Sequence, residues 1–309
     1  MSPKAKKVRR PRVPAYKSFK LSQSLKHTQT KLPSAWALTK DSIVTVKNNW
    51  RLFAGITAIY GILFLIFVRS ETGGIDVGSL KGAFNDTLGQ QSDNITASIS
   101  VFGELMKGPA AASNQLASLY QTLIFVVCSL AIIWALRQVQ DKSSAKIKVK
   151  DAFYKGMYPL VPFIIVLVVI TLQLVPISIA GSLYLRTIVE GLAITMVEKT
   201  VWILFIILLS TLSLYMFCSS IFAAYIVTLQ GMTPLKALRA ARQLVLHRRL
   251  AILSKLVWLG LALLIVFGLV IVPLIAFLPS LAEPVFFASS LSALLLVHTY
   301  LYNLYRSML

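Results

Sequence analysis

Six long runs of apolar residues divide this 309-residue chain, and polar segments of uneven length separate them. None of the runs has Asp, Glu, Lys or Arg in its interior. The hydrocarbon core of a bilayer is about 30 Å thick, which a helix of about 20 apolar residues can cross. A charge at the centre of such a helix costs about 2.5–3.5 kcal/mol or more. We therefore predict an all-α, polytopic membrane bundle whose six transmembrane helices fall at about residues 52–68, 116–136, 159–184, 201–229, 256–278 and 285–304.

The charged residues predict the direction in which the chain is threaded. Hydrophobic residues make up 57% of the chain and charged residues 14%, yet the formal net charge is +20. Of the 31 Lys and Arg residues, 26 fall in the N-terminal segment, the loops 137–158 and 230–255, and the C-terminus. Because cytoplasmic segments carry the excess of Lys and Arg, we predict that both termini are cytoplasmic. The outer side then includes one long loop, residues 70–115.

Residues 1–35 form a basic tail, and residues 36–309 form the membrane domain. The tail has no sustained apolar period and contains several prolines, so we expect it to be disordered on the cytoplasmic side. Three interpretations of its charge stay open: a topology signal, contact with anionic headgroups, and binding of nucleic acid. The third is the least favoured of the three.

Short stripes of apolar residues at helical spacing precede the first, third and fifth spans. The stripes consist of Ile43, Val46, Trp50 and Phe53; Val149, Phe153, Met157 and Leu160; and Leu235, Leu238, Ala241 and Val245. Basic residues lie between the apolar ones, which is typical of amphipathic helices in the membrane interface. Thr233 and Pro234 provide an N-cap and a first helical residue for the third. The chain is thus either three copies of a helix followed by a hairpin of two spans, or a coincidental similarity.

Polar residues inside the spans are few, and two of them are candidates for function. Gln173 lies close to Pro176 in the third span, where it either lines a polar cavity or makes one interhelical hydrogen bond. His298 lies among tyrosines near the inner end of the sixth span, where an interfacial amphipathic role is favoured. The sequence suggests no catalytic constellation, no metal site and no cofactor. We expect a protein that is not an enzyme.

Two segments resemble a known group of proteins. They are FAAYIVTLQGMTPLKALRAARQLVL, from Phe222 to Leu246, and TKDSIVTVKNNWRLF, from Thr39 to Phe53. Both resemble junctions in six-span bacterial membrane proteins that are similar to the membrane domain of glycerophosphodiester phosphodiesterases. The resemblance implies a bacterial cytoplasmic membrane. The phosphodiesterase domain itself has no counterpart here, so no catalytic residue is carried over.

Five basic residues on and after the third short helix are the candidate contacts for anionic headgroups or a partner: Lys236, Arg239, Arg242, Arg248 and Arg249. The first hypothesis is a non-enzymatic, membrane-organising or lipid-interacting protein that acts through this basic cytoplasmic face. The alternative is a permease, or the membrane subunit of a transporter, in which the helix 234–247 docks a partner protein. Nucleic acid is disfavoured as a partner, and only the basic tail leaves that interpretation open.

Overall fold

The fold is described from a computed structural model. The structure describes residues 32–70, 78, 81–82, 101–102, 115–141, 147–246 and 248–309. Most of the basic tail and most of the loop 70–115 therefore lie outside the described residues.

Every element in this part of the chain is a helix, and six helices are long and apolar enough to cross a membrane. These six candidate spans are Trp50–Arg69, Gln115–Gln140, Leu160–Ile188, Met196–Ile226, Arg249–Phe277 and Pro279–Met308. They match the six predicted spans in number and order, and several extend further. The observed helices are longer than the predicted spans because backbone hydrogen bonding continues into flanking polar residues, which the predictions from apolar runs did not include. The chain is a multi-pass membrane protein.

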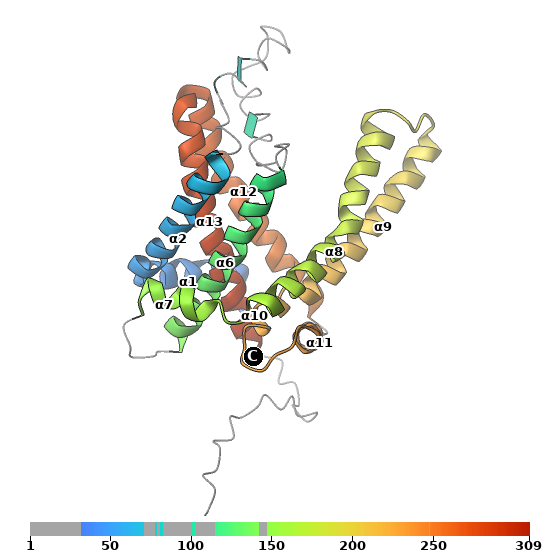
Figure 1. The fold of residues 1–309 in the computed structure, drawn as a ribbon. Coiled ribbons are helices and arrows are strands. Elements are labelled where there is room, and N and C mark those ends of the chain that lie inside the picture. The colour runs from blue at the N-terminus through green and yellow to red at the C-terminus, as the bar shows by residue number, and fades with distance from the viewer. Residues whose placement is uncertain are drawn as a thin grey trace, which may run out of the picture. The chain divides into compact units, whose positions relative to one another are not determined.

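The described helices repeat one order three times: a short helix, then two long helices (Figure 1). The first unit is α1 (Ala35–Asn48), α2 (Trp50–Phe64) with the π-helical turn η1 (Leu65–Arg69), and α6 (Gln115–Gln140). The second unit is α7 (Val149–Gly156), α8 (Leu160–Tyr184) with the π-helical turn η3 (Leu185–Val189), α9 (Met196–Ser220) and the short α10 (Ala223–Ile226). The third unit is α11 (Pro234–Val245), α12 (Arg249–Phe277) and α13 (Pro279–Met308).

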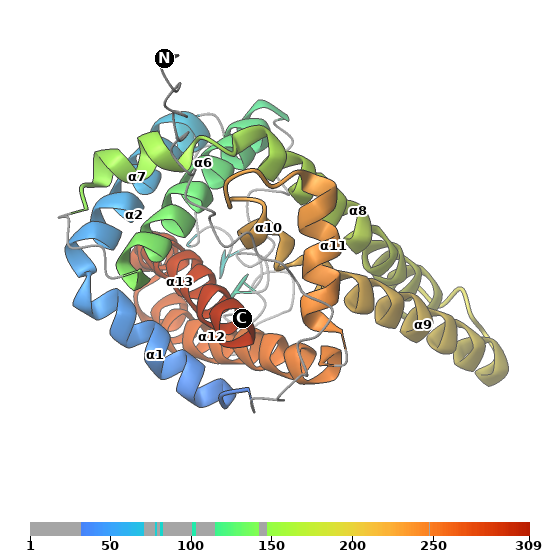
Figure 2. The same cartoon turned by 90° about the horizontal axis from the view of Figure 1, so that it is seen from below.

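The short helix that begins each unit packs against the long helices of a different unit (Figure 2). Helix α7 packs on α6 and α2 of the first unit, and α11 packs on α9 and α8 of the second. Helix α1 packs on α13 and α12 of the third unit, so the contacts between units close into a ring. The short helices, α10 and the C-terminus lie at the same end of the long helices, which we call the basic end (Figure 1).

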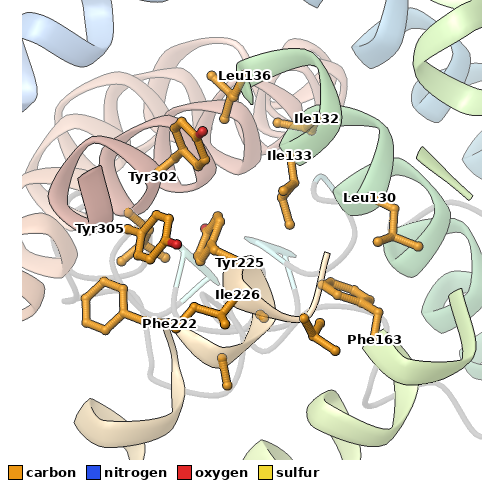
Figure 3. Packing of buried hydrophobic residues seen from close by; sticks show 14 of the residues in the cluster. Leu130, Ile132, Ile133, Leu136, Phe163, Phe222, Tyr225, Ile226, Tyr302 and Tyr305 are labelled. Atoms are coloured by element: carbon orange, nitrogen blue, oxygen red, sulfur yellow. The ribbon is translucent and has the colours of Figure 1, made fainter. Parts of the chain in front are cut away.

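Helix α6 is the centre of the core. Its residues are buried on nearly every side between Cys128 and Leu136, as is usual for a helix that is apolar all round. Side chains of α8, α10 and α13 pack around it (Figure 3). Gly156 lets the end of α7 approach closely, because a Cβ there would lie 3.1 Å from the carbonyl oxygen of Leu130.

Helices α8 and α9 pack along each other and lean away from the other long helices toward their far ends (Figures 1 and 2). Large apolar side chains along both remain exposed, including Leu172, Leu204 and Leu208, whose exposed fractions are 64%, 69% and 63%. In a membrane these surfaces contact lipid, since exposed apolar residues are favourable there.

The apolar stripes of the short helices are only partly those predicted. In α11 the packed residues are Ala237, Ala241 and Val245, whereas Leu235 is 68% exposed. In α1 the buried residues are Leu38 and Ser42. The predicted position Ile43 is exposed instead, as is Trp50 at the start of α2. In α11, small side chains allow close helix approach, so packing within the chain uses the alanine face. The exposed residues of the stripes stay predicted contacts of the membrane interface.

Candidate functional site: a basic helix face and buried polar chains

The five predicted basic residues lie on α11 and at the start of α12. Lys236, Arg239 and Arg242 are exposed on α11, opposite the alanines that pack on α8 and α9. Arg248 and Arg249 are half-buried, and Arg249 is the first residue of α12. Helix α11 is therefore packed on one face and exposes three basic side chains on the other. Two more basic residues lie where the next span begins.

The local sequence explains where α11 begins. Gly231 has φ +75° in the turn that leaves α10, a conformation that a residue with a Cβ adopts only with strain. Pro234 is the first helical residue, as predicted. Thr233 is the N-cap residue, as predicted, although its side chain makes no capping hydrogen bond.

Arg249 makes a specific contact with the preceding unit. Its guanidinium carbon lies 3.9 Å from the ring centroid of Tyr215 on α9, which is the geometry of a cation–π interaction. Its Nη1 is buried and has no hydrogen-bond partner within the described residues. The guanidinium is therefore oriented by the ring but not neutralised.

A chain of buried hydrogen bonds joins the three units near the basic end. The hydroxyl of Tyr225 on α10 lies 3.1 Å from Nδ1 of His298 on α13, and Nε2 of His298 lies 3.0 Å from Oγ of Ser129 on α6. All three residues are buried. The favoured interfacial interpretation of His298 was therefore wrong, because both ring nitrogens have partners inside the bundle. These two hydrogen bonds therefore connect three helices, one from each unit.

Arg137, at the basic end of α6, fixes α10 beneath this chain. Its guanidinium donates to the carbonyl oxygen of Thr228 at 2.9 Å and to the hydroxyl of Thr228 at 2.6 Å. Its Nη2 also lies 3.5 Å from the carbonyl oxygen of Tyr225 in α10. The last carbonyl groups of a helix have no partner within the helix, and a cation there satisfies them. An arginine that the sequence suggested only as a topology signal is thus part of the fold.

A second polar chain links α13, α6 and α1. Nη1 of Arg306 donates to Oε1 of Gln140 at 2.9 Å, and Nε2 of Gln140 donates to Oδ1 of Asn303 at 2.6 Å. Nδ2 of Asn303 donates to the hydroxyl of Ser42 at 3.1 Å, which donates to the carbonyl of Leu38 at 2.7 Å. An open hollow of about 350 Å³ adjoins this chain and is lined by Pro33, Leu38, Asp41, Thr45, Gln140, Asn303, Arg306 and Ser307.

Gln173, the other predicted intramembrane candidate, contributes its backbone to an interhelical bond. Its carbonyl oxygen accepts a hydrogen bond of 2.7 Å from the hydroxyl of Ser213 on α9. Its side-chain Oε1 is buried and has no partner among the described residues. The interhelical bond that the sequence suggested is present at this position, but the amide side chain does not make it.

The candidates do not converge on one centre. Gln173 lies on α8, His298 lies in the core, and the basic residues lie on α11 and α12. Cys128 and Cys218 are both free and buried. In the ranges that the structure describes, no group of three or more His, Cys, Asp or Glu residues is placed to hold a metal ion.

The chain matches no family model, no curated protein and no solved structure. The resemblance to the membrane domain of glycerophosphodiester phosphodiesterases therefore stays a prediction.

Sequence analysis did not single out several residues of these hydrogen-bonded chains, among them Ser129, Arg137 and Tyr225. Ser129 is one hydroxyl in a long apolar run, and Tyr225 lies in a segment singled out only for its resemblance to a family. One signal was available for Tyr225, because buried tyrosines usually find a partner for the hydroxyl. The identity of that partner depends on the packing of helices far apart in sequence.

Proposed function

We propose that this multi-pass membrane protein is non-enzymatic and interacts with anionic lipid through the basic face formed by α11 and the start of α12. The observation that carries the proposal is the arrangement of α11, which buries Ala237, Ala241 and Val245 and exposes Lys236, Arg239 and Arg242. A helix fixed on one side presents its charges without losing further order when it meets a surface.

The charge of this region supports a lipid partner. Residues 230–277 contain six Lys and Arg residues and no Asp or Glu. Each basic residue near an anionic membrane surface contributes about 1 kcal/mol of attraction. Leu235 is 68% exposed beside these charges, and an apolar side chain there can enter the headgroup boundary. The same face would meet the cytoplasmic leaflet in the predicted threading.

The test compares two variants of the full chain that lose equal charge. The first carries Gln at Lys236, Arg239, Arg242, Arg248 and Arg249. The control carries Gln at five other basic residues of the basic end, all exposed: Lys40, Lys47, Arg51, Lys148 and Lys150. Each protein is extracted in mild detergent, and the phospholipids that remain bound are quantified by headgroup together with any bound protein.

We expect wild type and control to retain anionic phospholipid in excess over zwitterionic phospholipid, and the first variant to lose most of that excess. Equal retention by all three proteins would contradict the proposal. Stoichiometric recovery of an ATPase that only the first variant loses would favour the permease alternative, with α11 as the docking helix.

A further inference from the structure

Arg249 is a cation that the described chain orients and leaves without an anionic partner. Its guanidinium carbon lies 3.9 Å from the centroid of the Tyr215 ring. The ion pair within the described residues is instead Arg69 with Glu283, at the opposite end of the long helices. The Nη1 of Arg249 is buried without an acceptor. A buried charged donor that lacks an acceptor is costly. The side chain as a whole is only half-buried, so an anion that reaches its accessible N–H groups would offset part of that cost.

The shape of the guanidinium limits how a partner can bind to it. A guanidinium is planar and its N–H groups lie in that plane. Its hydrogen bonds are therefore made at the edge of that plane. A phosphate matches this edge because two of its oxygens accept two parallel N–H bonds. The neighbouring Arg248 adds a second positive charge.

Apolar surfaces extend from this contact along both helices. Counting by the helical repeat, Leu204 and Leu208 share the face of Tyr215 on α9, and their exposed fractions are 69% and 63%. On α12, Gly260 shares the face of Arg249 and is exposed, with open space where a Cβ would lie. Helix α9 leans away from α12 beyond their contact (Figure 1), so both faces stay uncovered within the described residues.

The length of these surfaces fits one leaflet. Gly260 lies 11 residues from Arg249, and Leu204 lies 11 residues from Tyr215, which is about 16 Å along either helix. Half of a hydrocarbon core is about 15 Å thick. A molecule with a phosphate at Arg249 and an acyl chain along α9 and α12 would therefore end near the middle of the bilayer.

We propose that Arg249 and Tyr215 form the headgroup end of a site for one anionic phospholipid, whose acyl chain lies between the exposed faces of α9 and α12. This inference rests on the proposed function and narrows it from a basic surface to a single site. Preference for an anionic over a zwitterionic lipid follows from the lack of any acidic residue in 230–277, because the lipid charge then meets only cations.

The experiment uses native mass spectrometry of the full chain in detergent, titrated with phosphatidylglycerol, phosphatidylcholine or inorganic phosphate. We compare Arg249→Gln with Arg248→Gln, which removes the same charge one residue away. We also compare Gly260→Leu, which fills the acyl position, with Gly268→Leu. Gly268 is half-buried and also has open space where a Cβ would lie, but the helical repeat turns it about 100° away from the face of Arg249.

We expect Arg249→Gln to weaken phosphatidylglycerol binding about tenfold, the size of a lost charged hydrogen bond, and Arg248→Gln to weaken it much less. Gly260→Leu should weaken binding of the lipid, while Gly268→Leu should bind it as wild type does. Arg249→Lys keeps the charge without the planar fork and should fall between wild type and Arg249→Gln. Size-exclusion profiles show whether each variant remains folded.

Equal effects of Arg249→Gln and Arg248→Gln, or an unchanged affinity in Gly260→Leu, would overturn the single site. Displacement of the lipid by inorganic phosphate at similar concentration would show a plain anion site and would also overturn it. If the five-residue variant loses anionic lipid while these single variants do not, the proposed function of the basic face is supported and the single phospholipid site is contradicted. If the five-residue variant also behaves as wild type, the proposed function fails as well.

Discussion

Nε2 of His298 lies 3.0 Å from the hydroxyl oxygen of Ser129, although 169 residues separate them in the chain. The other ring nitrogen of His298 meets the hydroxyl of Tyr225 at 3.1 Å. Ser129, Tyr225 and His298 belong to the first, second and third unit respectively. The imidazole of His298 in the third unit therefore hydrogen-bonds to the first unit and to the second unit. This is the point at which α6, α10 and α13 meet.

Replacing His298 by Phe should loosen this junction. The variant keeps an aromatic ring of similar size but leaves two buried hydroxyl groups without their partner. Hydrogen bonds between membrane helices contribute about 0.6 kcal/mol each on average, and an orphaned buried group adds to the loss. We expect a loss of about 1–3 kcal/mol, measured as a lower thermal unfolding midpoint in detergent.

Two controls isolate the hydrogen bonds in that experiment. Tyr225→Phe removes only one of the bonds and should cost less than His298→Phe. Ser292→Ala removes an exposed hydroxyl that bonds within α13 and should leave the midpoint unchanged. A midpoint of His298→Phe equal to that of wild type would show that the chain contributes nothing to stability.

Replacing Gly156 by Leu should separate α7 from α6. Even a Cβ at Gly156 would lie 3.1 Å from the Leu130 carbonyl oxygen and 3.3 Å from the Ala131 Cα, both of them backbone atoms that cannot turn away. Overpacking of this kind typically costs about 1–3 kcal/mol. The matched control is Gly181→Leu on α8, where a Cβ meets nothing within 4 Å. Equal unfolding temperatures for Gly156→Leu and Gly181→Leu would contradict the close packing of α7 on α6.

Truncation of Leu38 tests whether the first unit closes the ring on the third. Leu38 is 2% exposed on α1, which packs on α13 and α12. Leu38→Ala should cost about 2–5 kcal/mol, as for other buried leucines. Ile43→Ala, at a residue of the same helix that is 50% exposed, should cost far less. Equal unfolding midpoints for the two variants would mean that α1 is not packed as described.

The direction of threading can be measured with reporter fusions after residues 90, 145, 193, 242 and 309. The distribution of Lys and Arg predicts that fusions at 145, 242 and 309 stay in the cytoplasm and that those at 90 and 193 are exported. An exported reporter at 145 or 242 would refute this threading, and the basic end would then face the opposite side of the membrane.

Much of the helix order was predictable because it depends on local properties. The length of an apolar run decides whether a helix can span the membrane, and Pro234 marks the beginning of α11 whatever surrounds it. The packed face of α11 was not predictable in the same way. Leu235 fits a helical stripe, yet it is exposed, while Ala237 is fully buried, because the neighbouring helices α8 and α9 approach closely on the alanine side.

The sequence by itself determined that this is an all-helical, six-span membrane protein with its basic residues concentrated in a few segments, since hydropathy and charge are properties of each segment alone. Only the tertiary structure decided that Ser129, Tyr225 and His298 meet, and that Arg249 contacts the ring of Tyr215. These contacts join helices of different units. They depend on how whole helices pack, which no local pattern of residues specifies.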